Sequence, residues 1–146
     1  MDGVALHHIE TKPFPPAILT HAPCVEFATF YNLEDGFTQN MRAFAQAVQT
    51  GSPDGFVGHA TGEVVEQITR PVDGAREGKA AVLLFAWESK QKHLEFRETE
   101  LFAKNIHLLR AKHGGVEMVS LQTLVKDLVN DGLVSCVFHG RNKALI

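Results

Sequence analysis

Apolar and polar side chains recur with two different periods along the chain, and the period separates strands from helices. Residues 24–33 alternate, with Phe27 and Tyr31 among the residues on one face, which predicts a strand. Residues 37–51 instead repeat their apolar positions every three or four residues, which predicts an amphipathic helix that ends before Pro53. The apolar positions of this helix are Phe37, Met41, Phe44, Ala45 and Val48.

The second half of the chain repeats this order of elements. Residues 54–68 and 79–88 predict two further strands, the first of them bent at its glycines. Ser89 is suited to cap a second helix, and residues 116–125 predict a last strand. One broad side of this helix carries Leu94, Leu101, Phe102, Leu108 and Leu109. The order β-α-β-β-α-β predicts an α+β fold, the ferredoxin-like split βαβ arrangement, with a four-stranded antiparallel sheet and helices on one face.

The strand predicted at 79–88 is apolar on both faces. Val82 and Leu84 point to one side, whereas Leu83 and Phe85 point to the other. An antiparallel sheet that is covered by helices on one side only normally alternates with polar residues on its free side. A second copy of the sheet is the simplest cover for the other face, so the pattern predicts a homodimer.

Charge and composition exclude several classes of protein. The 146 residues carry a net charge of −3 with a pI near 6.2, and no basic run is present. These values exclude a nucleic-acid-binding or membrane-surface protein, and with them an RNA-binding domain of the same strand order. The longest apolar run is too short to cross a bilayer, and neither an export signal nor a CxxC pair is present, which predicts a cytoplasmic protein.

The chain divides into three parts. Residues 1–23 are rich in proline and histidine and predict an irregular lead-in, and residues 24–118 form the α+β domain. Residues 119–146 are expected to be a C-terminal extension with the end of the last strand, a short amphipathic helix and a further strand. This extension is either peculiar to this chain or translated intron sequence that begins at Val119.

One motif spans the junction between the two-faced strand and the second helix. Trp87, Ser89, His93 and Phe96 occur there in the spacing Trp-x-Ser-x-x-x-His-x-x-Phe. Together with the upstream segment GFVGHATGEVVE, this motif resembles the dimeric α+β barrel proteins, especially the fungal antibiotic-biosynthesis-monooxygenase and stress-responsive A/B barrel groups. The resemblance covers roughly residues 24–118.

The resemblance implies that each subunit binds a small molecule between its sheet and its helices. It implies cofactor-free oxygenation of aromatic polyketides, aldol-type cyclisation, haem degradation or no known activity, and a shared fold does not choose among them. The chain departs from the fungal pattern at Thr61, where tryptophan is frequent, and at His59 two residues earlier. This change would leave more room in the pocket and add a titratable group.

Four residues are candidates for catalysis. His59 and His93 are each suited to be a general base, His59 because its small neighbours leave room for a ligand and His93 because it lies where the pocket would open. Glu26 could orient a histidine, and Tyr31 could stabilise an enolate. The alternatives are structural: a core histidine, a helix histidine bonded to Glu88, an interface carboxylate and a tyrosine at the rim of the core.

The candidate substrate contacts are Phe27, Phe85, Trp87 and Arg97. The three aromatic side chains are walls of the pocket or part of a dimer core, and Arg97 either binds a substrate carboxylate or pairs with a glutamate of its own helix. No His-x-x-x-His pair, Gly-rich phosphate loop or nucleophile elbow is present. Neither a metal nor a cofactor is therefore expected.

These observations predict a cofactor-independent enzyme of fungal secondary metabolism that acts on an aromatic or polyketide-derived substrate. The expected reaction is a cyclisation, rearrangement or elimination through enolate chemistry, with His59 or His93 as general base. A cofactor-free monooxygenase is one alternative. A non-catalytic dimeric stress or ligand-binding protein is the other.

Overall fold

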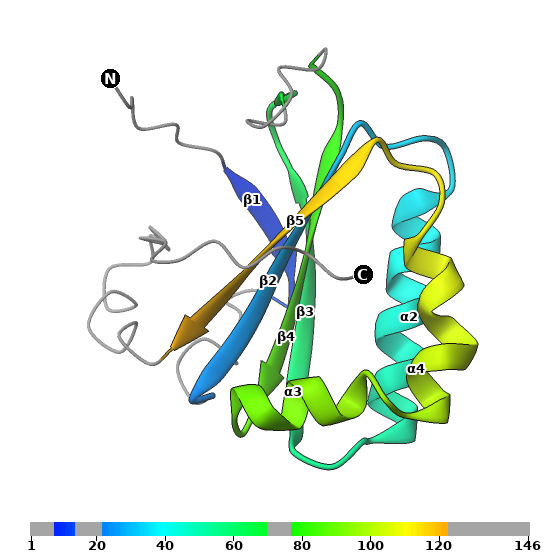
Figure 1. Ribbon diagram of the computed structural model, residues 1–146. Coiled ribbons are helices and arrows are strands. Elements are labelled where there is room, and N and C mark those ends of the chain that lie inside the picture. Colours follow the sequence, from blue (N-terminus) through cyan, green and yellow to red (C-terminus); the bar gives the residue numbers. More distant parts are fainter. Residues whose placement is uncertain (1–7, 14–21, 70–76, 123–146) are drawn as a thin grey trace.

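A single antiparallel sheet forms the centre of the molecule. The computed structural model describes residues 8–13, 22–69 and 77–122. Within them, five strands pair in the order β1-β3-β4-β2-β5. The helices of this part of the chain all lie on one side of the sheet (Figure 1). The predicted ferredoxin-like α+β fold is confirmed.

Four of the strands follow the sequence prediction. They are β2 (Cys24–Tyr31), β3 (Phe56–Val64), β4 (Ala80–Trp87) and β5 (Gly115–Gln122). β4 lies between β3 and β2 at the centre of the sheet, and β5 pairs with the other edge of β2. All eight residues of β4 are buried, which explains why this strand has no polar alternation.

A fifth strand, β1 (Ile9–Lys12), corrects the prediction of an irregular lead-in and of a four-stranded sheet. β1 pairs antiparallel with β3, so that Ile9 lies opposite Val64 and Lys12 opposite Thr61. A strand of four residues spans only two alternations, too few for a pattern to show in the sequence. The helix and strand predicted beyond residue 122 lie outside the described residues, and the division into domains stays a prediction.

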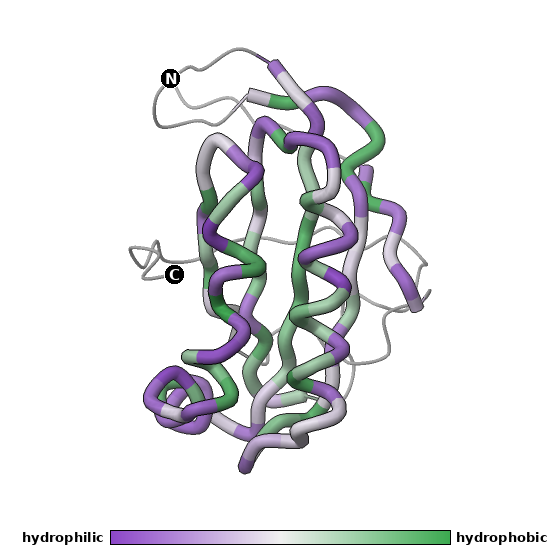
Figure 2. The backbone as a smooth tube through the Cα atoms, turned by 90° about the vertical axis from the view of Figure 1, so that its right-hand side faces the viewer, coloured by the Kyte–Doolittle hydropathy of each residue, from purple (hydrophilic) through white to green (hydrophobic). Residues whose placement is uncertain are grey.

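The first helix, α2 (Phe37–Gly51), packs on the sheet through the five apolar residues that the sequence predicted. It ends at Ser52, whose left-handed backbone lets its N–H donate to the carbonyl of Val48 at 2.9 Å. Figure 2 shows the hydrophobic positions of the helices interleaved with hydrophilic ones in front of the sheet, as expected for helices with one buried side.

The second predicted helix is divided into three pieces, α3 (Lys90–Phe96), α4 (Glu100–Asn105) and the 3-10 turn η1 (Ile106–Leu109). The break occurs at Thr99, whose hydroxyl accepts from the backbone N–H of Phe102 at 3.3 Å and so caps a new helix. The predicted apolar side is wrong at Leu94, which is 42% exposed. The separate axes of α3 and α4 turn this side chain out of the layer that packs on the sheet.

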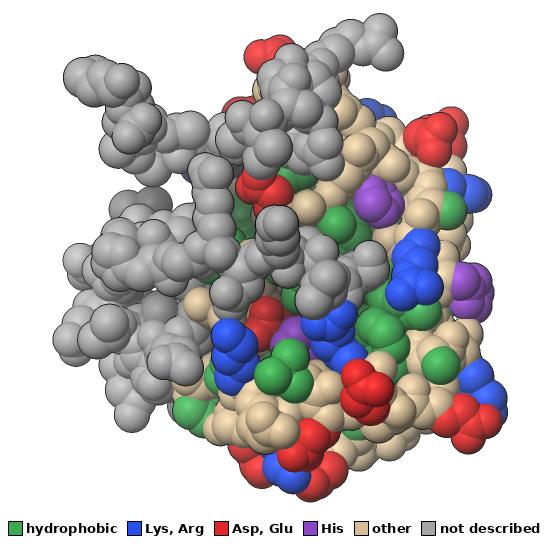
Figure 3. Space-filling view, in the orientation of Figure 1, with side chains coloured by type: hydrophobic (Ala, Val, Ile, Leu, Met, Phe, Trp, Pro, Cys, Tyr) green, Lys and Arg blue, Asp and Glu red, His purple; other side chains and the backbone are tan. Residues whose placement is uncertain are grey.

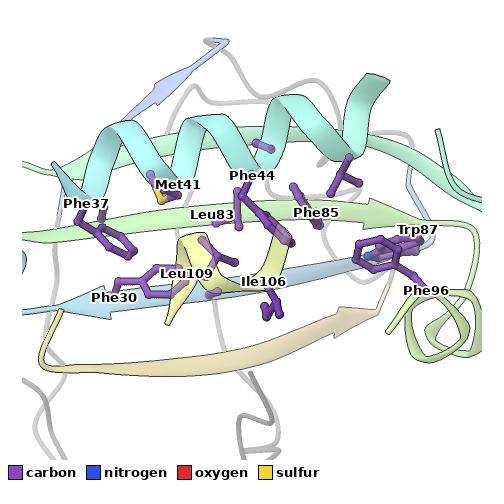
Figure 4. Packing of buried hydrophobic residues seen from close by; sticks show 14 of the residues in the cluster. Phe30, Phe37, Met41, Phe44, Leu83, Phe85, Trp87, Phe96, Ile106 and Leu109 are labelled. Atoms are coloured by element: carbon purple, nitrogen blue, oxygen red, sulfur yellow. The ribbon is translucent and has the colours of Figure 1, made fainter. Parts of the chain in front are cut away.

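The main core fills the space between α2, the short helices and the sheet. Figure 4 shows Phe44, Phe85, Ile106 and Leu109 pointing into this layer, with Trp87 beside Phe96 at its far end. Phe44 stacks on Phe85 with ring centroids 5.7 Å apart. Each fully buried side chain of this size contributes roughly 1.5–3 kcal/mol. This layer therefore accounts for a large part of the stability.

A second apolar cluster lies on the face of the sheet away from the helices. Its buried members are Ala22, Val25, Phe27, Ala60, Val82, Leu84 and Ala86. Both faces of β4 are thus apolar, as the sequence predicted. These side chains are already buried within one chain. The apolar character of this face therefore does not by itself require a second copy of the sheet, and the homodimer stays a prediction.

A β-bulge at the start of β3 changes which side chains share a face. Phe56 lies opposite Trp87 and Gly58 opposite Ala86, so the register shifts by one residue between them. Strict alternation along β3 would place Phe56 and His59 on opposite faces, but the bulge brings them to the same face. Both rings contact Phe85 on the helix side, with centroid distances of 5.4 and 6.2 Å.

Among the described residues, no helix combines the length and the apolar character needed to cross a membrane.

Candidate active site

A pocket opens between the sheet and the helices, where the resemblance implied one. Its cavity volume is about 40 Å³. The lining is formed by Glu26, Ala28, Phe44, Leu83, Phe85, His93, Phe96, Arg97, Phe102, Ile106, Leu109 and Met118. Nine of these twelve side chains are apolar, and the polar remainder is one acid, one histidine and one arginine. In Figure 3, acidic, basic, histidine and hydrophobic side chains lie close together among the described residues of this face.

Local structure places His93 at this pocket. β4 ends at Trp87, and the hydroxyl of Ser89 accepts from the backbone N–H of Lys92 at 3.2 Å, which caps α3 as predicted. The ammonium of Lys92 pairs with Asp54, which precedes β3, and with Glu95 at 3.2 Å. The pair with Asp54 links α3 to the residue before β3, whereas the pair with Glu95 lies within α3 itself.

The same ion pairs shift two pKa values at the surface. Hydrogen bonding to Asp54 and Glu95 raises the pKa of Lys92, and the Lys92 ammonium lowers the pKa of the Asp54 carboxyl. Gly55 lies beside this clamp with φ +78°, and a Cβ there would fall 2.4 Å from Cγ of Lys92. Glycine thus allows both the left-handed turn and the close approach of the lysine.

Glu26 and His93 form the polar centre of the pocket. Nδ1 of His93 lies 3.2 Å from Oε1 of Glu26, and the two side chains are 12% and 9% exposed. The imidazole also lies over Trp87, with ring centroids 5.5 Å apart. The predicted role of Glu26 was to orient a histidine, and the structure brings it to His93. A carboxylate at Nδ1 leaves Nε2 as the nitrogen that can exchange a proton with a bound molecule.

Ser120 completes this group, although no motif in the sequence pointed to it. Its hydroxyl donates to Oε1 of Glu26 at 2.8 Å, and the two residues are direct partners in the β2–β5 ladder. The alternation of the last predicted strand already placed Ser120 on the same face as Met118, which lines the pocket. The sequence carries no signal for the register that sets this face against Glu26.

His59 lies on the same side of the sheet but belongs to a different environment. Its Nδ1 is 3.2 Å from Oε1 of Gln49 on α2, and its ring meets Phe85 edge-on. Burial lowers the pKa of His59, as expected for an imidazole that loses part of its water. His59 is not among the residues that line the pocket with His93.

Two other candidates point away from the pocket. Phe27 belongs to the apolar cluster on the opposite face of the sheet. Tyr31 packs with Ile68 and Ala80, and its hydroxyl donates to Oε2 of Glu117 at 3.2 Å. Within one chain, Tyr31 is therefore not placed to stabilise an enolate beside His93.

Of the remaining predicted substrate contacts, two line the pocket and one, Trp87, does not. Phe85 and Arg97 line the pocket, with Arg97 one helical turn after His93. Trp87 is fully buried behind this lining, and its indole N–H has no hydrogen-bond partner among the described residues. Trp87 thus supports the His93 ring from below. Across the described ranges, no three His, Cys, Asp or Glu side chains gather as metal ligands.

The chain resembles known proteins in its structure. No protein-family model matches the chain, and no curated protein matches it either. An anthrone oxidase-like protein of known structure is 19% identical over 70% of the chain, with a TM-score of 0.52. The chain spans 43% of the length of that protein.

Two smaller proteins of known structure also match. A variant of SnoaB, a cofactor-independent oxygenase from Streptomyces nogalater, is 17% identical with a TM-score of 0.48. The match covers 70% of this chain and 95% of that one. An antibiotic biosynthesis monooxygenase is 12% identical with a TM-score of 0.46, covering 69% and 98% of the two chains. The match to the anthrone oxidase-like protein, whose TM-score exceeds 0.5, agrees with the α+β fold given by the strand order.

Proposed function

We propose that the chain is a cofactor-independent enzyme that uses His93 as general base on an aromatic or polyketide-derived small molecule. The observation that carries this proposal is the contact between Glu26 and His93 at the polar end of an apolar pocket. A histidine oriented by a carboxylate and adjacent to a small-molecule cavity is a recurrent arrangement for proton abstraction. Of the two histidines that the sequence singled out, the geometry favours His93.

The proposed chemistry begins with removal of a proton from an acidic C–H group. Nε2 of His93 takes the proton, and the carboxylate of Glu26 stabilises the imidazolium that results. The substrate is left as an enolate or carbanion. Cyclisation, rearrangement or elimination can follow from that species without a further group from the protein.

The composition of the lining supports the proposal of an aromatic substrate. Phe44, Phe85, Phe96 and Phe102 offer ring edges and faces to a planar aromatic molecule. Arg97 is suited to meet a phenolate or carboxylate oxygen of that molecule. The cavity of about 40 Å³ is much smaller than the sites of drug-sized ligands. Side chains at the mouth must therefore move before a polycyclic substrate can enter.

Oxygenation is the second candidate function. The fold is shared with an anthrone oxidase-like protein, and the same first step would serve that chemistry. An anthrone carbanion that reacts with O2 gives anthraquinone and hydroxide, which takes the proton back from the His93 imidazolium to form water, so the substrate supplies all the electrons. His93 would have the same role in both candidate reactions.

The test uses anthrone as the probe and separates the two steps. In D2O without O2, the wild-type protein is expected to speed exchange of the anthrone methylene protons, followed by NMR. The His93→Ala variant is expected to lose this acceleration by about 100-fold, a usual contribution of a general base. The matched control is His59→Ala, which removes a histidine outside the pocket and is expected to retain exchange.

Equal exchange with wild type and His93→Ala, or no acceleration by any of the proteins, would contradict the proposal.

Admission of O2 then distinguishes the two candidate reactions, because an oxygenase consumes O2 as anthraquinone appears. Exchange without O2 uptake favours cyclase or lyase chemistry. Binding of anthrone without exchange would instead support the ligand-binding alternative. A fungal origin, the cytoplasmic location and the homodimer stay predictions.

A further inference from the structure

A row of polar side chains continues behind the Glu26–His93 pair. Glu26 and Ser120 lie directly opposite each other on β2 and β5, and Cys24 lies two residues before Glu26 on the same face. The sulfur of Cys24 is 3.6 Å from Oγ of Ser120. Cys24 and Glu26 are 2% and 7% exposed and Ser120 is half-buried, so the row leads from the interior of the protein toward its surface.

The hydrogen bonds in the row have a fixed direction. Ser120 has one hydroxyl hydrogen, and it is donated to Oε1 of Glu26 at 2.8 Å. The contact between Cys24 and Ser120 therefore requires the thiol as donor. Burial raises the pKa of the Cys24 thiol, so the sulfur keeps its hydrogen at neutral pH. The row thus runs from the thiol through the hydroxyl to the carboxylate.

We infer that Ser120 is a positioning residue, which orients the Glu26 carboxylate and through it the His93 imidazole. A glutamate has three side-chain torsions, and its Oε1 both accepts from the Ser120 hydroxyl and lies 3.2 Å from Nδ1 of His93. The Ser120 hydroxyl holds Oε1 in the position from which the carboxylate meets the ring. For the reaction this inference rests on the proposed function, because the positioning matters there only if His93 transfers a proton.

The inference is tested first without a substrate. In protein with 15N-labelled histidine, the NMR shifts of the His93 nitrogens report which nitrogen carries the hydrogen. The wild-type ring is expected to hold its hydrogen on Nδ1, facing Glu26, and Ser120→Ala is expected to shift this population toward the other tautomer. A purely structural role for Ser120 would lower the melting temperature and leave the tautomer unchanged.

Two further variants form a matched pair at the same position. Ser120→Thr keeps the hydroxyl and Ser120→Val replaces it with a methyl group, while both are branched residues that suit a strand. The threonine variant is expected to show the wild-type tautomer and the valine variant that of Ser120→Ala. Identical tautomers in the two variants would overturn the inference, and this comparison remains decisive if Ser120→Ala fails to fold.

Exchange of anthrone protons then links positioning to chemistry. Ser120→Ala is expected to lower kcat about tenfold with little change in KM, as for other residues that orient a catalytic group, and Ser120→Thr is expected to restore it. A changed tautomer without exchange by any of the proteins would refute the proposed function and leave the positioning role in place. Equal exchange by the wild type, Ser120→Ala and Ser120→Thr, with the same His93 tautomer in each, would refute the positioning role of Ser120 and leave the proposed function in place.

Discussion

Glu26 is a carboxylate on an otherwise apolar strand, and it is only 7% exposed. A buried carboxylate lowers stability unless other groups replace the hydrogen bonds that water gave it. Here Ser120 and His93 contact one of its oxygens, at 2.8 and 3.2 Å. An apolar side chain would fill this position without that requirement. The presence of the acid at the pocket is therefore explained better by chemistry than by packing.

His59 leads to a prediction about pH at the scale of one residue. Burial lowers its pKa in the folded protein below the ordinary value of 6.5. As the pH falls, the unfolded chain thus takes up a proton at His59 before the folded chain does. Its contribution to stability is complete above the unfolded pKa and is lost as the pH falls through the folded pKa.

The His59→Gln variant is expected to lose less stability than the wild type between about pH 7 and pH 5, because no imidazole is left to charge. Urea unfolding at each pH measures the difference. Glutamine keeps a polar group beside Gln49, so the comparison isolates the titration. Parallel pH profiles for the two proteins would contradict the assignment.

At the scale of the element, α3 is a helix of seven residues that cannot be stable by itself. Three groups hold it: the Ser89 cap, the Lys92 clamp and Phe96, which packs against Trp87 at a centroid distance of 5.1 Å. His93 lies in the middle of this helix. The position of the proposed base therefore depends on an element whose stability comes mainly from its contacts with the rest of the protein.

Removal of the cap should affect both stability and the site. Ser89→Ala is expected to lower the free energy of unfolding by about 1 kcal/mol, because the N–H of Lys92 loses its acceptor. It is also expected to slow anthrone exchange, since the first turn of α3 carries His93. Ser89→Asp keeps a capping oxygen and should retain both properties. A Ser89→Ala variant with the stability and the exchange rate of the wild type would contradict this prediction and show that other contacts hold α3.

At the scale of the whole molecule, the sheet has two apolar faces and the described helices cover one of them. The two faces differ in their polar residues, since the residues proposed to act in catalysis all lie on the helix side. Phe27 and Tyr31, which the sequence analysis placed in the site, lie on the other face. The side chains of this face are buried within one chain, and it is the face on which the sequence pattern predicted a partner sheet.

The expected dimer gives the prediction at this scale. Light scattering at micromolar concentration should report twice the 16.1 kDa of one chain. The interface is expected to lie on the side of the sheet opposite the helices, because packed sheets of this kind interdigitate apolar side chains. A well-folded monomer across a dilution series would contradict the dimer and leave the pocket, which lies on the helix side, unaffected.

The sequence by itself determined the elements that depend on local pattern. The period of α2, the unbroken apolar run of β4 and the Ser89 cap were all predicted, because neighbouring residues determine period and capping. The same local reasoning placed His93 just inside the helix that follows β4. It also identified Glu26 as a residue that could orient a histidine.

Tertiary structure alone decided how these parts meet. The contact of Ser120 with Glu26 joins residues 94 positions apart, and it depends on the register of β5 against β2. The bulge in β3 and the pairing of β1 likewise depend on distant partners. A change of register by one residue moves every side chain of a strand to the other face. The proposal of His93 rather than His59 as the base therefore rests on the assembled sheet, which brings Glu26 to His93 and Gln49 to His59.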